Sequence, residues 1–220
     1  MAVMTMIIGK SGTGKTASMR NLDPSRVALI GAVEKPLPFR AKGWVSKCTD
    51  NWNAVLKTAH VAAERGRDII VIDDFQYIMA NEFMRRSDEK SYDKFTEIAR
   101  HAWEVIMGLA ALPSHVRVYM LTHAEEDANG GTKAKTIGKM LDEKICLEGL
   151  FATVLRTSVQ DGQYLFSTRN NGSDTVKSPM GLFSEDFIEN DLKKVDDEIV
   201  SYYDINTASA DTKTTDEVTQ

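Results

Sequence analysis

The sequence predicts an α/β fold, with a mostly parallel sheet flanked by helices and a C-terminal hairpin. Three observations indicate it. Short continuous apolar runs, such as residues 68–73, are typical of parallel strands that are covered on both faces. Helical patterns, such as that of residues 95–112, separate these runs along the chain. Near the C-terminus, two further runs flank Asp161-Gly162, a pair that favours a tight turn between antiparallel strands.

The first part of the chain alternates between strands and helices. Apolar runs predict three strands, the third of them short, at residues 3–8, at 26–31 and around Val45. Residues 16–22 can form a helix that Asp23-Pro24 ends. A longer helix, with apolar side chains at helical spacing, begins at a cap supplied by Asp50 or Asn51 and runs to about residue 65. Gly66 ends this helix.

The second part of the chain repeats this alternation. The strand at 68–73 ends in two acids, and a helix follows at 95–112, where Pro113 stops it. A strand is predicted at 116–121. After a Gly-rich loop, we expect a helix at 137–150. The predicted hairpin pairs residues 152–158 with residues 163–168.

Length and composition limit the functions that the chain can have. With 220 residues, of which 42% are hydrophobic, we expect a single domain at residues 1–205 and a flexible polar tail at 206–220. No apolar run approaches the ~20 residues of a membrane span. The chain enters a strand at once, so no signal peptide is expected, and Cys48 and Cys146 favour buried free thiols in a reducing cytoplasm. A net charge of −5 does not indicate a generally basic, nucleic-acid-binding surface.

One octet carries the most chemistry. It fits the P-loop pattern G-x-x-x-x-G-K-[ST] at every fixed position and consists of Gly9, Lys10, Ser11, Gly12, Thr13, Gly14, Lys15 and Thr16. Glycines let the backbone N–H groups surround a phosphate, Lys15 brings a positive charge to the β- and γ-phosphates, and Thr16 places a hydroxyl on Mg²⁺. The apolar run directly before the loop is the context that the motif requires. We therefore expect ATP and Mg²⁺ as cofactors.

Three carboxylates are candidates for the rest of this site. Asp73 follows four apolar residues, which is the Walker B pattern of a metal ligand at a strand end. Glu34 lies just past the second strand, at the sheet edge where ligands bind in open α/β folds, and is the first candidate for the general base. Asp74 is the alternative: it either polarises the attacking water or only caps the next helix.

The order of these parts resembles the RecA core. A P-loop, a strand ending near a Glu, a Walker B strand, a helix and a strand ending in Thr122-His123 follow one another as in RecA-like ATPases. The resemblance covers roughly residues 3–185 and is strongest to the small single-domain RecA-like ATPases of bacteriophages, some of which are single-strand annealing recombinases. It implies a homo-oligomeric ring or filament in the cytoplasm, the host cytoplasm for a phage-encoded protein.

The resemblance also implies roles for single residues. His123 falls where RecA-like ATPases carry a polar sensor of the γ-phosphate, although those proteins usually have Gln or Asn there. Arg169 is the basic residue that remains of a Lys-x-Lys or Lys-x-Arg pair, and it would act on the γ-phosphate of the neighbouring subunit. The alternative for Arg169 is an ordinary surface residue at a strand end.

Two segments match the DNA-binding loops of RecA-like proteins, at residues 80–94 and 124–138. Basic residues in and beside them are candidates for phosphate contacts: Arg85, Arg86, Lys133, Lys135 and Lys139. Acidic neighbours, such as Glu125 and Glu126, leave open that these are ordinary solvated loops.

Together, these features predict a Mg²⁺-dependent ATPase that assembles with itself and acts on single-stranded DNA in phage-type recombination or replication. A single-strand DNA-binding protein is a possible partner, and no membrane is expected. Two alternatives stay open: a helicase loader or helicase-like motor, and a nucleotide-dependent assembly switch with little hydrolysis.

Overall fold

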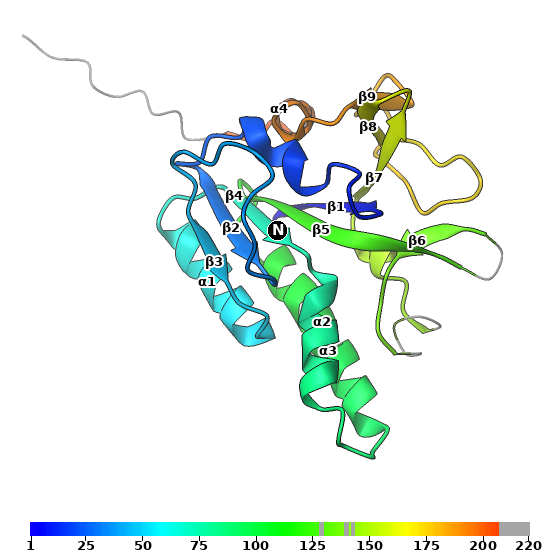
Figure 1. Ribbon diagram of the computed structural model, residues 1–220. Coiled ribbons are helices and arrows are strands. Elements are labelled where there is room, and N and C mark those ends of the chain that lie inside the picture. Colours follow the sequence, from blue (N-terminus) through cyan, green and yellow to red (C-terminus); the bar gives the residue numbers. More distant parts are fainter. Residues whose placement is uncertain (128–129, 139–140, 142–143, 207–220) are drawn as a thin grey trace, which may run out of the picture.

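A nine-stranded mixed sheet forms the centre of the protein (Figure 1). The computed structural model describes residues 1–127, 130–138, 141 and 144–206. The strands follow the order β3-β2-β4-β5-β1-β7-β8-β9, and β6 pairs with β5 outside this row. The first six strands of the row are parallel: β3 (Ser46–Cys48), β2 (Val27–Gly31), β4 (Ile69–Asp73), β5 (Arg117–Glu126), β1 (Val3–Gly9) and β7 (Thr153–Gln160). The antiparallel strands are β8 (Gln163–Ser167), β9 (Phe187–Glu189) and β6 (Thr132–Ala134).

Helices cover both faces of the sheet. On one face, α1 (Trp52–Glu64), α2 (Gln76–Arg85) and α3 (Asp93–Ala110) pack against side chains such as Met6 and Ile72. On the other face, the 3-10 helix η1 (Thr16–Asn21) and helix α4 (Leu192–Tyr202) pack against side chains such as Ile7 and Val71. Neighbouring residues of one strand thus enter opposite cores, which is why the central strands read as unbroken apolar runs.

Most predicted elements are confirmed. The α/β class, the mostly parallel sheet and the strands around the P-loop are present, and Asn51 caps α1 by accepting a hydrogen bond from the backbone N–H of Ala54 at 2.9 Å. The predicted hairpin is β7–β8, and its turn residues Asp161 and Gly162 both have positive φ, at 50° and 78°. These angles are typical of the tight hairpin turn that the pair predicts.

Several predictions were wrong. The 80–94 loop is partly helical, because α2 extends through its first residues and α3 begins at Asp93. Strand β5 extends beyond residue 121 to Glu126, since its next two residues pair with β1 and its last three pair with β6. The helix predicted at 137–150 is tested only in part, because residues 139, 140, 142 and 143 lie outside the described residues; its last four residues form the 3-10 helix η3 (Leu147–Leu150). Strand β9 and helix α4 were not predicted.

Other expectations concern the surface and the chain end. Cys48 and Cys146 are free thiols, as expected, but both are exposed rather than buried. Of the tail predicted at 206–220, residues 207–220 lie outside the described part. None of the helices that the structure describes is long and apolar enough to cross a membrane.

A buried charge network attaches α4 to the sheet. The fully buried guanidinium of Arg117 donates to both carboxylate oxygens of Asp196 on α4, at 2.9 and 3.0 Å, and to Asp68 at 3.0 Å. The Tyr119 hydroxyl donates to Asp196 at 2.5 Å. Since buried carboxylates are tolerated only when they are paired, Arg117 holds the start of β4, the start of β5 and helix α4 together.

Removing Arg117 should therefore be costly. We expect Arg117→Met to lower the free energy of unfolding by about 3–5 kcal/mol, because it leaves the buried carboxylate of Asp196 without its cationic partner, while Asp68 keeps only Arg26. Arg100→Met is the matched control: Arg100 is half-exposed and pairs with Glu104 on α3, so its loss should cost ~0–1 kcal/mol. Urea unfolding of both variants measures the difference. Equal costs would contradict the role given to Arg117.

Candidate functional site

The P-loop connects β1 to η1 at the carboxyl edge of the sheet. Gly12 and Gly14 have positive φ angles of 77° and 96°, which side chains rarely allow. A Cβ placed on Gly9 would lie 1.8 Å from the Thr157 hydroxyl on β7. Thr13 hydrogen-bonds the same hydroxyl at 2.6 Å and donates to the Lys10 carbonyl at 2.7 Å. The glycines of the motif are thus required by the shape of the loop and by its contact with β7.

Lys15 lies buried across the inside of this loop. Its Nζ donates to the carbonyl oxygens of Gly9 and Lys10 at 2.8 and 2.9 Å. Burial lowers the pKa of Lys15 from 10.5 to about 8, although the charges of Asp74 and Asp73 act in the opposite direction. The ammonium group is therefore costly to keep charged, and a bound anion would stabilise it.

Thr16 and Asp73 come together from different elements. The Thr16 hydroxyl, at the start of η1, lies 3.0 and 3.1 Å from the two carboxylate oxygens of Asp73, at the end of β4. Burial raises the pKa of Asp73, and the neighbouring charge of Asp74 adds to this effect. A hydroxyl and a carboxylate are oxygen ligands that fit Mg²⁺, which usually takes few protein ligands besides substrate phosphates and water. The described residues contain no cluster of three or more His, Cys, Asp or Glu that could hold a metal ion.

Asp74 occupies the centre of a second group of charges. Its backbone is in the left-handed region, with φ of 60°, and its N–H donates to Asp73 at 3.0 Å. Its side chain is almost fully buried, pairs with Lys35 and lies 3.7 Å from Nε2 of His123. Burial, followed by the charge of Lys15, lowers the pKa of His123, so the ring is neutral at pH 7.

These groups face one hollow. We call it the P-loop hollow: it measures about 360 Å³, and its lining includes Gly12, Lys15, Thr16, Lys35, Asp74 and His123. Glu34 is not one of the described residues that line the P-loop hollow. Glu34 is exposed, makes no hydrogen bond or ion pair with another described residue, and lines a neighbouring hollow together with Asp73. The structure thus places Asp74, and not Glu34, beside Lys15 and Thr16.

Arg169 lies away from this hollow. Its guanidinium bonds Asp186 at 2.7 Å and the backbone carbonyl oxygen of Ser184 at 3.0 Å, so it folds back onto its own chain. The side chain is still 56% exposed.

The basic candidates on α2 are surrounded by acids. Arg85 pairs with Asp50 at 2.6 Å, and Arg86 pairs with three glutamates at 2.7–3.1 Å: Glu82, Glu89 and Glu97. These acidic partners neutralise the positive charges of Arg85 and Arg86, which weakens the attraction that the two residues could exert on a DNA phosphate.

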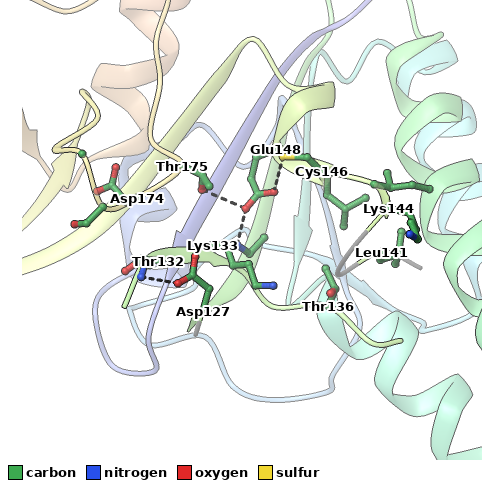
Figure 2. Close-up of a pocket in the computed structure, with 16 residues that line it drawn as sticks. Asp127, Thr132, Lys133, Thr136, Leu141, Lys144, Cys146, Glu148, Asp174 and Thr175 are labelled. Carbon is green, nitrogen blue, oxygen red and sulfur yellow. Dashed lines mark hydrogen bonds between the residues drawn. The ribbon is translucent and has the colours of Figure 1, made fainter. Parts of the chain in front are cut away.

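Lys133 lies on β6, and Lys135 directly follows this strand. Lys135 is exposed, and Lys133 is 3.8 Å from Glu125, whereas Lys139 is outside the described residues. Figure 2 shows how this segment is anchored over a second hollow of about 560 Å³. The buried carboxylate of Glu148 accepts hydrogen bonds from the Ala134 backbone N–H at 2.7 Å and from the Thr175 hydroxyl at 3.2 Å. Glu148 thus fixes the strand that carries Lys133.

Sequence reasoning missed several residues of the site. Lys35 adjoins Glu34, but nothing in the sequence signals that it pairs with Asp74. Thr157 contacts the P-loop only because β1 and β7 are neighbours in the sheet. Comparison with the sequence models of known protein families and with curated proteins found no match for this chain.

The contact between Gly9 and Thr157 can be tested through stability. We expect Gly9→Ala to cost about 1–3 kcal/mol of unfolding free energy, because the added methyl group overlaps the Thr157 hydroxyl. Adding Thr157→Ala should recover part of this cost. Gly149→Ala is the control, since a Cβ there meets its nearest neighbour at 3.8 Å. Strictly additive costs for the Gly9 and Thr157 substitutions would show that the two residues do not constrain each other.

Proposed function

We propose that this protein is a Mg²⁺-dependent ATPase of the RecA-like type that acts on single-stranded DNA. The observation that carries the proposal is the meeting of Thr16 and Asp73, at 3.0–3.1 Å, beside the buried ammonium of Lys15. The motif predicts these three groups as neighbours, although Asp73 is 57 residues from Thr16 in the chain. Their proximity supports a site for a nucleotide triphosphate with its metal ion.

Strand order supports the RecA-like assignment. Strand β5 lies between the P-loop strand β1 and the strand that ends in Asp73. Its pairing with β1 places His123 opposite Gly9, at the start of the P-loop. His123 is therefore near the position that the proposed γ-phosphate sensor requires. Its neutral ring can donate or accept one hydrogen bond there.

Among the carboxylates, the geometry favours Asp74 for orienting the attacking water. It lines the P-loop hollow, and its pairing with Lys35 fixes the position of the carboxylate. A positive φ outside glycine is also more frequent at functional sites than elsewhere. In this assignment, Lys15 stabilises the transferred phosphoryl charge, Thr16 and Asp73 hold the metal ion, and Asp74 directs the water.

DNA binding is proposed for the β5–β6 hairpin. The backbone N–H of Lys135 donates to the carbonyl oxygen of His123 at 2.8 Å, so the basic segment continues directly from the nucleotide site. A DNA phosphate bound by Lys133 and Lys135 would act on the same backbone that positions His123. This connection favours DNA-stimulated hydrolysis over a switch that barely hydrolyses ATP. Self-assembly and a role for Arg169 at the neighbouring subunit remain part of the proposal.

Phosphate release with and without a single-stranded oligonucleotide tests the function. We expect the wild type to hydrolyse ATP, and to do so faster with DNA. Lys15→Ala should lose nearly all activity, because it removes the cation from the phosphates. Asp74→Asn should slow turnover by on the order of 10²-fold, whereas Glu34→Gln should stay close to the wild type. Lys193→Ala is the control, since Lys193 pairs with Asp197 on the surface of α4.

Each result has a distinct meaning. Wild-type turnover in Lys15→Ala would overturn the site itself. A slow Glu34→Gln variant together with an active Asp74→Asn variant would exchange the two carboxylates. Hydrolysis that does not respond to DNA would contradict the DNA-dependent part of the proposal, whereas ATP binding with little hydrolysis in the presence or absence of DNA would favour the assembly switch.

A further inference from the structure

Another hollow adjoins the P-loop hollow. It measures about 640 Å³, and its lining comes from η1 and from the strands β8 and β9. Figure 1 shows these two strands at one end of the sheet. Gly14, Ala17 and Tyr164 line both hollows. A molecule with phosphates in the P-loop can therefore place its remaining part in this adjoining hollow, which we call the β8–β9 hollow.

Tyr164 and Asn190 form the wall next to the P-loop. They face each other across the two strands, since the Asn190 N–H donates to the Tyr164 carbonyl oxygen at 3.1 Å. A Cβ placed on Gly14 would lie 2.9 Å from Oδ1 of Asn190 and 3.1 Å from the Tyr164 ring. Both side chains thus reach the point where the loop enters η1.

The two side chains differ in exposure. Tyr164 is 50% exposed, so one part of its ring is open to a ligand. Asn190 is only 3% exposed, and its Nδ2 has no hydrogen-bond partner among the described residues. A buried amide without a partner is uncommon and calls for an explanation. The backbone that carries it is fixed, because Arg20 on η1 donates to the Asn190 carbonyl oxygen at 2.7 Å.

These features match the chemistry of a purine. An aromatic ring provides a stacking surface for any base. An asparagine amide offers a donor and an acceptor side by side, which fits N7 and the N6 amino group of adenine, whereas guanine presents two acceptors at the corresponding edge. We propose that the β8–β9 hollow binds the nucleobase of the nucleotide, with Tyr164 stacking on it and Asn190 selecting adenine. This inference rests on the proposed nucleotide site.

Equilibrium binding of four ligands tests it: ATP, GTP, 7-deaza-ATP and inorganic tripolyphosphate, each with Mg²⁺. The wild type should bind ATP about 5- to 150-fold more tightly than GTP or 7-deaza-ATP, which lacks N7. Tyr164→Leu should weaken ATP binding by about the same factor and leave tripolyphosphate binding unchanged. Tyr164→Phe should retain the affinity, since it keeps the ring. Asn190→Ala should bind ATP and 7-deaza-ATP equally.

Tyr203→Leu is the matched control, because Tyr203 is a partly exposed tyrosine at the end of α4. Equal binding of ATP and 7-deaza-ATP by the wild type would overturn the assignment of Asn190. A Tyr164→Leu variant that loses tripolyphosphate as strongly as ATP would show a structural role instead of stacking. Lys15-dependent binding of all four ligands with equal affinity would leave the proposed function intact and refute the base site. If the wild type binds none of the four ligands, both the proposed nucleotide site and the base site are refuted.

Discussion

Three buried charges at one edge of the sheet constrain this structure. Lys15, Asp73 and Asp74 are each less than 7% exposed, and an unpaired charge in such a place costs several kcal/mol. Each is therefore compensated: Lys15 by two backbone carbonyls, Asp73 by the Thr16 hydroxyl and a backbone N–H, and Asp74 by Lys35. The compensation depends on bringing the ends of β1 and β4 together. Strand β5 does this by pairing with both in parallel register.

The same strand extends the site toward the surface. β5 contributes His123 beside Asp74 and then continues into the hairpin with β6, where Lys133 and Lys135 lie. Glu148, shown in Figure 2, accepts a hydrogen bond from the Ala134 backbone N–H at 2.7 Å and so holds β6 in place. A ligand at the hairpin and a ligand at the P-loop would thus act on one continuous piece of backbone. This arrangement gives the proposed coupling between DNA and hydrolysis a physical route.

Sequence patterns predicted the centre of the fold better than its periphery. Central parallel strands such as β4 are buried on both faces, so their apolar runs are visible without knowledge of the tertiary structure. The P-loop octet is local as well, and its partner Asp73 is marked by its place at a strand end. The end of β5 is different, because residues 122 and 123 pair with β1 and residues 124–126 pair with β6, and neither pairing is visible in the sequence. Helix α4 was missed although its buried positions, Leu192, Val195 and Ile199, have helical spacing. Its attachment through Asp196 depends on Arg117, which is 79 residues away in the chain. Lys35 and Asn190 were missed for the same reason: the tertiary fold alone brings Lys35 to Asp74 and Asn190 to Gly14.

Proton uptake on nucleotide binding tests the central claim most directly. The pKa of Lys15 is about 8 in the free protein, so above that pH its amine is mostly neutral. Contact with phosphates favours the charged form and raises this pKa, so binding of Mg·ATP must take up a proton. Calorimetry at pH 8.5 in buffers of different ionisation enthalpy measures that proton. The account predicts uptake of a large fraction of one proton at pH 8.5, close to none at pH 6.5, and none at either pH for Lys15→Arg. Absence of binding, or binding by the wild type without this pH-dependent uptake, would contradict it.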